Sequence, residues 1–156
     1  MATVLIPIAS GCEELEAVTL IDLLRRAGIT VTVAGLEAGP VTASRGVVLL
    51  PETTLDQVLN QDFDMVVLPG GLGGAQQLEA DQRIARLLRQ MTEQGRFVAA
   101  ICAAPRVLAS AGLLKNRKAT AYPGILDGHP EIQVSSAAIV RDGTFVTSRG
   151  PGTAMD

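Results

Sequence analysis

Short apolar runs, separated by turn residues, predict the strands of this chain. Residues 3–8, 65–68 and 97–101 are almost continuously apolar, which is typical of parallel strands that are buried on both faces. Residues 29–34 are rich in alternating β-branched side chains and predict a fourth strand. Weaker signals predict a small hairpin from residues 41–42 and 46–50, a short strand within 118–124, and a strand pair within 136–148 around the hairpin signal Asp142-Gly143.

Helical periodicity occupies the segments between these runs. Residues 13–27 predict a helix that ends at Gly28, a residue type that often follows the last helical turn. Apolar residues at helical spacing predict a second helix from about Asp81 to Glu93, and a third is predicted over residues 103–111. Because strands alternate with helices, the chain predicts one α/β domain with a largely parallel sheet. Ligands bind such sheets outside the carboxyl ends of the strands.

The end of the sequence, TFVTSRGPGTAMD, reads as a strand, a turn and a helix that starts at Thr153. A parallel sheet needs helices on both faces. We therefore expect that residues 1–156 form a single domain truncated at its C-terminus, with one helix missing from this chain. The alternative is a domain that ends in a frayed turn.

Composition narrows the class of protein. Hydrophobic residues make up 47% of the 156 residues and charged residues 19%, so we expect a globular fold. A net charge of −3 and an aromatic content of 3% disfavour nucleic-acid binding. We find no apolar run of membrane-spanning length and no stretch that reads as a secretory leader, so we expect a soluble, cytoplasmic protein. Two cysteines and one histidine are too few for a disulfide framework or a Cys/His metal cluster.

Cys102 ends the apolar run 97–101 abruptly, in the stretch AAICAAP, just before a predicted helix. A strand-to-helix turn with small neighbours resembles the nucleophile elbow of hydrolases, although the pattern is not G-x-S-x-G. The unpaired N–H groups at a helix N-terminus lower the pKa of a thiol, and Pro105 suits the first helical turn. The alternative is a cysteine that is buried as a small hydrophobic residue. The pattern alone does not decide between the two.

Glu16 is the second candidate for a chemical role. It lies on the face of helix 13–27 that also carries Leu20, Leu24 and Ala27. A carboxyl group in apolar surroundings has a raised pKa. Such a group donates a hydrogen bond to a nearby thiolate and later transfers a proton. The alternative is an acid that complements the positive end of the helix dipole.

Three further features are weaker candidates. The stretch LPGGLGG, residues 68–74, offers backbone N–H groups that stabilise an oxyanion, but it lacks the GK[ST] ending of a phosphate-binding loop. Cys12 precedes a helix, where a thiol is somewhat acidic, or it is simply a small loop residue. His129 lies in the turn DGHPE and reads as a surface histidine.

Taken together, the chain resembles the ThiJ/PfpI superfamily and, within it, the branch of parkinsonism-associated, YajL/ThiJ-like deglycases. The matching stretches cover nearly all of the chain and occur in the family's order: EELEAVTLIDLLRRAGITVTVAG, SRGVVLLP, DMVVLPGGLGGAQQL, AAICAAPRVLA and VTSRGPGTA. The resemblance implies a flavodoxin-like α/β sandwich, a homodimer, and a chain that continues into one more helix after RGPGTA.

The resemblance also implies roles for single residues. Cys102 matches the family's nucleophilic, oxidation-prone cysteine, and Glu16 matches its protonated partner acid. Gly71 and Ala103 match positions whose backbone N–H groups face the reacting oxygen, with Gly70 beside them as a further substrate-binding candidate. The candidate pocket residues are Tyr122, Arg45 and Arg26, of which the two arginines match basic residues near the family's dimer interface.

The chain departs from the family pattern at several positions. Ala103 stands where peptidase-like members have a histidine, which disfavours a Cys–His hydrolase. Tyr122 stands where nearer relatives often have a histidine, so its hydroxyl is the candidate replacement, and His129 is not in register for this role. Ala43 and Leu50 stand where some relatives have additional cysteines.

Two functions are therefore expected. The first is a cofactor-independent glyoxalase III or protein deglycase, linked to oxidative and carbonyl stress, that acts through Cys102 on methylglyoxal-type dicarbonyls or their early adducts on proteins and nucleotides. The second is a redox sensor or redox-regulated chaperone in which Cys102 is oxidised to sulfinic acid. A structural relative with an inert cysteine is the remaining alternative. The expected partners are small substrates and a second copy of the chain, with no nucleic acid, membrane, metal or organic cofactor.

Overall fold

The centre of the fold is a parallel sheet, and the computed structural model describes all residues from 1 to 156. The seven strands lie in the order β10-β11-β7-β6-β1-β2-β5. Only β10 runs antiparallel to its neighbour. The bounds are β1 (Thr3–Ile8), β2 (Thr30–Gly35), β5 (Thr53–Thr54), β6 (Met65–Leu68), β7 (Phe97–Ile101), β10 (Ile139–Asp142) and β11 (Phe145–Ser148). The predicted α/β fold with a mostly parallel sheet is confirmed.

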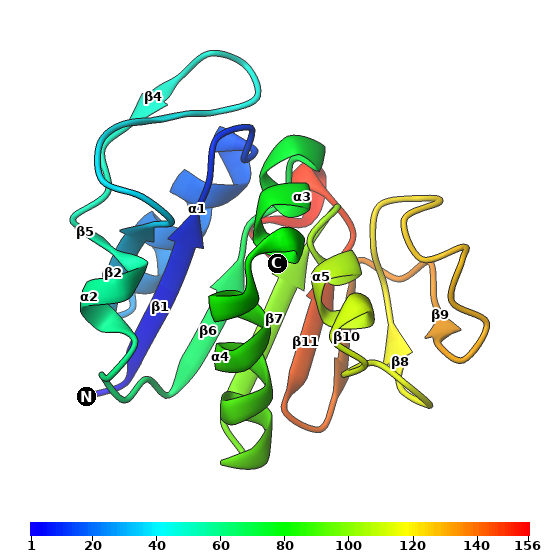
Figure 1. Ribbon diagram of the computed structural model, residues 1–156. Helices are drawn as coiled ribbons and strands as arrows, with labels where there is room; N and C mark the ends of the chain where they lie inside the picture. The colour runs from blue at the N-terminus through cyan, green and yellow to red at the C-terminus, as the bar shows by residue number, and fades with distance from the viewer.

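Helices cover both faces of this sheet (Figure 1). In the view of Figure 1, α1 (Glu14–Arg26) lies behind the sheet, and α2 (Leu55–Val58), α3 (Leu72–Ala80), α4 (Gln82–Glu93) and α5 (Pro105–Ser110) lie in front of it. None of these helices is both long enough and apolar enough to cross a membrane.

The buried strands divide their side chains between two hydrophobic cores. Successive residues of a strand point to opposite faces of the sheet. Val66 and Val98 belong to the larger core, beneath α2 to α5, whereas Val67 and Ala99 join Ala17 of α1 in the smaller core. Full burial of such a side chain contributes about 1.5–3 kcal/mol. This two-sided burial explains why the central strands are continuously apolar in sequence.

Two small sheets lie beside the main one. β3 (Val41–Thr42) pairs antiparallel with β4 (Val48–Leu49), as the sequence predicted for this hairpin. β8 (Lys118–Ala119) pairs parallel with β9 (Gln133–Val134). The strand pair predicted around Asp142-Gly143 is confirmed as β10 and β11, and a short 3-10 turn, Pro151–Thr153, follows β11.

The segment after β6 differs most from the sequence-based prediction. Its glycines suggest a loop because glycine disfavours helix by about 1 kcal/mol, yet α3 occupies residues 72–80. Close packing explains why glycine stands in this helix, since a Cβ atom on Gly74 would lie 2.7 Å from Cys12 Cα. An ion pair of 2.6 Å between Glu79 and Arg106 then joins α3 to α5.

The α1 face of the sheet contains an apolar cavity of about 260 Å³. It lies between α1, β6, β7, β10, β11 and the last residues of the chain, and most of its lining is apolar, including Leu20, Leu24, Met65, Ile139 and Val146. The helix expected to start at Thr153 is not seen in residues 153–156, because Thr153 ends a 3-10 helix and a turn follows; a helix beyond residue 156 stays a prediction.

Candidate active site

Three loops meet at the carboxyl edge of the sheet, one each after β1, β6 and β7. The Glu13 N–H group donates to the Gly70 carbonyl oxygen at 2.9 Å. The Gly70 N–H group donates to Glu16 Oε1, also at 2.9 Å. A Cβ atom on Gly70 would lie 2.7 Å from Cys102 Cβ. The structure therefore brings Cys102 and Glu16 together, with Gly70 between them, as the topology predicted.

Cys102 sits on a strained turn. Its φ angle is +63°, a region that few residues other than glycine adopt. Its N–H group donates to the Ser148 carbonyl oxygen at 2.9 Å, and its own carbonyl oxygen accepts from the Tyr122 N–H group at 2.8 Å. Regular helix begins only at Pro105, later than predicted. The residue is 9% exposed, so the surrounding backbone holds the thiol in a fixed and nearly enclosed position.

Glu16 is completely buried in the first turn of α1. The helix starts here because the Glu13 carboxylate accepts a hydrogen bond from the Glu16 N–H group at 2.9 Å. Glu16 Oε1 accepts from Gly70, but Oε2 has no hydrogen bond of normal geometry. Burial raises the pKa of Glu16 to about 7, against the opposing effects of the nearby Cys102 thiol and the Gly70 N–H group. Glu16 therefore carries a proton much more often than an ordinary glutamate.

The thiol of Cys102 is less acidic than the sequence predicted. Burial and the negative charge of the nearby Glu16 carboxylate raise the pKa of Cys102 to about 12. The backbone N–H groups of Gly71 and Ala103 oppose this rise. The prediction of a lowered pKa counted only the helix end and left out the enclosure of the sulfur and the charge of Glu16. A proton on Glu16 removes that charge, so the thiolate forms most readily when Glu16 is neutral.

The Gly71 and Ala103 N–H groups lie close enough to the sulfur of Cys102 to oppose the rise of its pKa, and their role as a pair that holds an oxyanion stays a prediction. Gly70 does not belong to this pair, because its N–H group is already bonded to Glu16. The Gly70 N–H group thus positions the acid, and the expectation that Gly70 also binds substrate stays a prediction. Gly71 itself has φ +86°, and a Cβ atom there would overlap the Gly11 carbonyl oxygen.

The candidate pocket residues lie in three different places. Tyr122 is at the edge of the site, where its N–H group bonds Cys102 and its side chain is 53% exposed. Arg45 lies in the β3–β4 hairpin, and its N–H group donates to Glu14 at 2.8 Å. Arg26 is at the far end of α1 from Glu16 and pairs with Asp22 on the surface. The structure thus places Arg26 away from the Cys102–Glu16 pair, and its assignment to the pocket stays a prediction.

The surroundings of the two remaining candidates, His129 and Cys12, indicate structural roles. His129 pairs with Glu131 at 3.1 Å on a surface turn, as its sequence context predicted. Cys12 is buried, and burial together with Glu14 and Glu13 raises its pKa to about 11, so it is not an acidic thiol. Both cysteines are free, and no cluster of ligands suitable for a metal ion is present.

Sequence reasoning missed one part of the site. A cavity of about 340 Å³ is lined by Tyr122 and Arg149 among others, and the Tyr122 N–H group donates to the Cys102 carbonyl oxygen at 2.8 Å. Arg149 directly follows Ser148, which accepts the hydrogen bond of Cys102. The sequence signal that could have indicated this cavity is the turn SRG, residues 148–150, at the end of β11. This turn lies at the same carboxyl edge of the sheet as Cys102.

Comparisons with known proteins agree with this architecture. Residues 2–156 match the DJ-1/PfpI family. Protein dj-1beta of Drosophila melanogaster is 46% identical over 158 residues, which cover 97% of this chain and 83% of that protein. Deglycase PH1704 of Pyrococcus horikoshii is 35% identical over 145 residues, 92% of this chain and 87% of that protein. The structure of Toxoplasma gondii DJ-1, oxidized, has a TM-score of 0.95 at 38% identity and covers 99% of this chain and 85% of its own.

The fold and the turn at Cys102 first define a class, the α/β proteins that carry a cysteine on a strained strand-to-helix turn. With the match over residues 2–156, the chain belongs to the DJ-1/PfpI family. The resemblance drawn from the sequence motifs is confirmed. Relatives that include a named deglycase support a role of the DJ-1 type in this chain.

Proposed function

We propose that this chain is a cofactor-independent glyoxalase and deglycase that acts on α-oxoaldehydes such as methylglyoxal and on their early adducts. The main observation behind this proposal is the pair formed by Cys102 and Glu16. Cys102 lies on a strained turn, and Glu16 is a buried acid with a pKa of about 7 and an unpaired Oε2. A group that titrates near neutrality both accepts and donates protons efficiently.

In the first step, Cys102 Sγ attacks the aldehyde carbon of methylglyoxal and a C–S bond forms. The thiol proton passes to the Glu16 carboxylate, and the carbonyl π electrons move to the oxygen. The Gly71 and Ala103 N–H groups, which lie close to the sulfur, stabilise this oxyanion. Protonation of the oxygen by Glu16 gives a neutral hemithioacetal and returns Glu16 to its carboxylate form.

In the second step, the Glu16 carboxylate removes the proton from the former aldehyde carbon and returns it to the adjacent carbon, while the hydroxyl proton of the hemithioacetal moves to the neighbouring oxygen. The product is a thioester of lactate on Cys102. Water cleaves the C–S bond, releases lactate and restores the thiol. The reaction is an internal redox change of the substrate, so it needs no external oxidant or reductant.

Lactate formation from methylglyoxal tests this proposal directly. We expect a kcat/KM in or near the range of ordinary enzymes, roughly 10⁴–10⁸ M⁻¹s⁻¹, and none above background in Cys102→Ala. A rate that is unchanged in Cys102→Ala would overturn the mechanism.

A redox sensor or redox-regulated chaperone is the second candidate function. The supporting observation is the unpaired Glu16 Oε2 near Cys102, because a protonated acid there donates a hydrogen bond to a sulfinate and limits further oxidation. Peroxide treatment followed by intact mass should then show a stable gain of two oxygen atoms on Cys102. Progressive oxidation without such a stop would count against this role.

We further propose that the chain forms a homodimer in the cytoplasm. Exposed apolar side chains gather on α1 and around β4: Leu15, Val18, Val47, Val48 and Leu50. Hydrogen bonds from Ser44 and Arg45 to Glu14 hold the hairpin against α1, so these side chains belong to connected elements. An exposed apolar patch favours association, and two free cysteines suit a reducing compartment. Sedimentation of Val18→Lys, compared with the unmodified chain, tests the dimer.

A further inference from the structure

A cavity outside the Cys102–Glu16 pair offers a second binding site. It has a volume of about 340 Å³ and is lined by residues 121–124, 126–127, 134–136 and Arg149. Two backbone links join it to the candidate nucleophile. The Tyr122 N–H group donates to the Cys102 carbonyl oxygen at 2.8 Å, and Cys102 donates at 2.9 Å to Ser148, the residue before Arg149. Two segments that line the cavity are therefore fixed to the backbone of the residue that carries the candidate nucleophile.

Arg149 is the cation of this cavity, and it has no acidic partner. Several arginines form ion pairs, for example Arg25, Arg83 and Arg106, and those that form none apart from Arg149 are exposed: Arg45, Arg86, Arg89 and Arg141. The Arg149 side chain makes neither an ion pair nor a hydrogen bond, although the residue is half-buried. A partly desolvated guanidinium without a counter-ion is costly and favours an anion with two oxygens in a plane.

The rest of the lining suits the same kind of ligand. Tyr122, Ser135 and Ser136 contribute hydroxyl groups to the lining of the cavity. Tyr122 and Val134 also line it, and these two residues are 53% and 56% exposed. Asp127 is the one carboxylate in the lining. It is exposed and forms no ion pair with Arg149, so its charge opposes anion binding without cancelling the Arg149 site.

We propose that this cavity is an anion subsite that binds the carboxylate or phosphate end of a substrate whose aldehyde reacts at Cys102. The proposal rests on the proposed function and names its substrate class: α-oxoaldehydes, or adducts, that carry an acidic group a few carbons from the reacting carbonyl. Methylglyoxal, which has no such group, leaves the subsite empty and is the poorer substrate.

Paired substrates test this assignment. Lactate-type product formation is compared for methylglyoxal, for 4,5-dioxopentanoate and for the amide of 4,5-dioxopentanoate, which has nearly the same shape but no charge. We expect Arg149→Gln to reduce kcat/KM for the anionic substrate at least 10-fold more than for the two neutral ones, in line with the roughly 1.5–3 kcal/mol of a charged hydrogen bond. Arg89→Gln, which removes an exposed, unpaired arginine from α4, should leave all three values unchanged. Equal losses on charged and neutral substrates would overturn the subsite.

Asp127→Asn provides a change of opposite sign in the same cavity. Removal of this carboxylate should raise kcat/KM for 4,5-dioxopentanoate by about 2- to 5-fold, which is the size of a partly screened interaction of 0.5–1 kcal/mol. A decrease for the anionic substrate alone would contradict the assignment. Because a misfolded variant does not gain activity, this result does not depend on how well Arg149→Gln folds.

A binding measurement separates the subsite from the chemistry. Unreactive probes, 4-oxopentanoate, its amide and inorganic phosphate, are titrated into Cys102→Ala, and the amide signals of residues 121–127 and 149 are followed by NMR. Saturable shifts with 4-oxopentanoate or phosphate, lost in Arg149→Gln, support the subsite and show whether carboxylate or phosphate is preferred. Equal shifts with the neutral amide overturn it. Anion binding without turnover of any dicarbonyl would leave the subsite standing and remove the proposed function.

Discussion

Two carboxylates of this chain, Glu16 and Asp81, show how surroundings decide the role of an acid. Glu16 is completely buried, meets no cation and has an unpaired oxygen, so burial raises its pKa to about 7. Asp81 lies beside the Arg83 guanidinium, which holds its pKa below the usual range. The first acid can exchange a proton near neutrality, whereas the second is a permanent charge that fixes structure.

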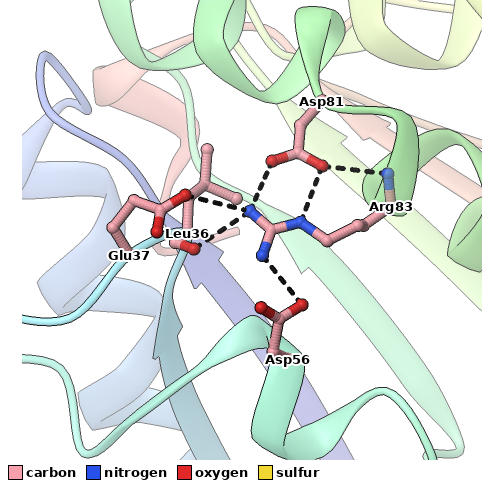
Figure 2. A network of polar contacts seen from close by, with 5 residues as sticks. All are labelled: Leu36, Glu37, Asp56, Asp81 and Arg83. Atoms are coloured by element: carbon pink, nitrogen blue, oxygen red, sulfur yellow. Dashed lines mark hydrogen bonds and ion pairs between the residues drawn. The ribbon is translucent and has the colours of Figure 1, made fainter.

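The Arg83 network shows the structural case in detail (Figure 2). Two nitrogens of the guanidinium donate hydrogen bonds to the Asp81 carboxylate at 3.1 and 2.7 Å, and the third donates to Asp56 at 2.9 Å. It also donates to the Leu36 carbonyl oxygen at 3.0 Å and lies 3.5 Å from Glu37. One side chain thus ties the start of α4 to α2 and to the end of β2. Every nitrogen of the guanidinium has a partner here, in contrast to the unpaired Oε2 of Glu16 and the unpaired Arg149.

The largest expected difference between the two regions is in activity. Glu16→Gln keeps the shape of the side chain but cannot transfer a proton, so we expect kcat for lactate formation to fall by about 10²–10⁴-fold. Asp81→Asn should change kcat less than about 3-fold, because this residue does not touch the site. Steady-state kinetics on methylglyoxal, with both variants checked for folding by circular dichroism, gives the comparison. A fully active Glu16→Gln would remove the acid from the mechanism.

The next largest effect concerns the backbone at Gly71, where the loop after β6 packs against residues 11–13. Gly71→Ala combines a positive φ with overlap of the Gly11 carbonyl oxygen, and we expect a loss of about 3 kcal/mol or more in the free energy of unfolding. Gly112→Ala is the matched control, because Gly112 has φ +75° but open space around its Cβ position. That variant should lose only about 1–2 kcal/mol, the cost of the backbone conformation alone. Equal losses by urea denaturation would show that crowding at the site contributes nothing.

The pH dependence of stability should have opposite signs in the two regions. The folded pKa of Glu16 is raised from 4.5 to about 7, so stability should fall as pH rises between these values, by about 3 kcal/mol in total. Asp81 has a lowered pKa, so its contribution is lost only in strong acid. Urea unfolding of the unmodified chain and of Glu16→Gln at pH 5 and pH 8 isolates the effect, since the amide of the variant does not titrate. If both proteins show the same pH dependence, Glu16 does not have a raised pKa.

The sequence predicted the parts of this molecule that depend on local pattern. The continuous apolar runs gave the central strands, and the end of the run at Cys102 gave the turn on which the cysteine stands. The features that could not be predicted from the sequence depend on contacts between residues that are far apart in the chain. The close approach of residue 12 leaves no room for a side chain at Gly74 in α3, and the burial of Cys102, together with the charge of Glu16, reverses the predicted pKa shift of its thiol. The partners of Arg83 come from residues 36–37, 56 and 81, and no local motif connects them.

The smallest effect is expected where the Arg83 network is broken. Arg83→Gln loses its charged hydrogen bonds to Asp81 and Asp56, and we expect a loss of about 1–3 kcal/mol in the free energy of unfolding. Arg89→Gln, on the same helix but exposed and unpaired, should change it by less than about 0.5 kcal/mol. Urea denaturation at low and high salt measures both, and kcat on methylglyoxal should stay within about 2-fold in each. A large loss of kcat in Arg83→Gln at unchanged stability would mean that the Arg83 network affects the active site. Asp81 could then no longer be described as an acid with a purely structural role, in contrast to Glu16.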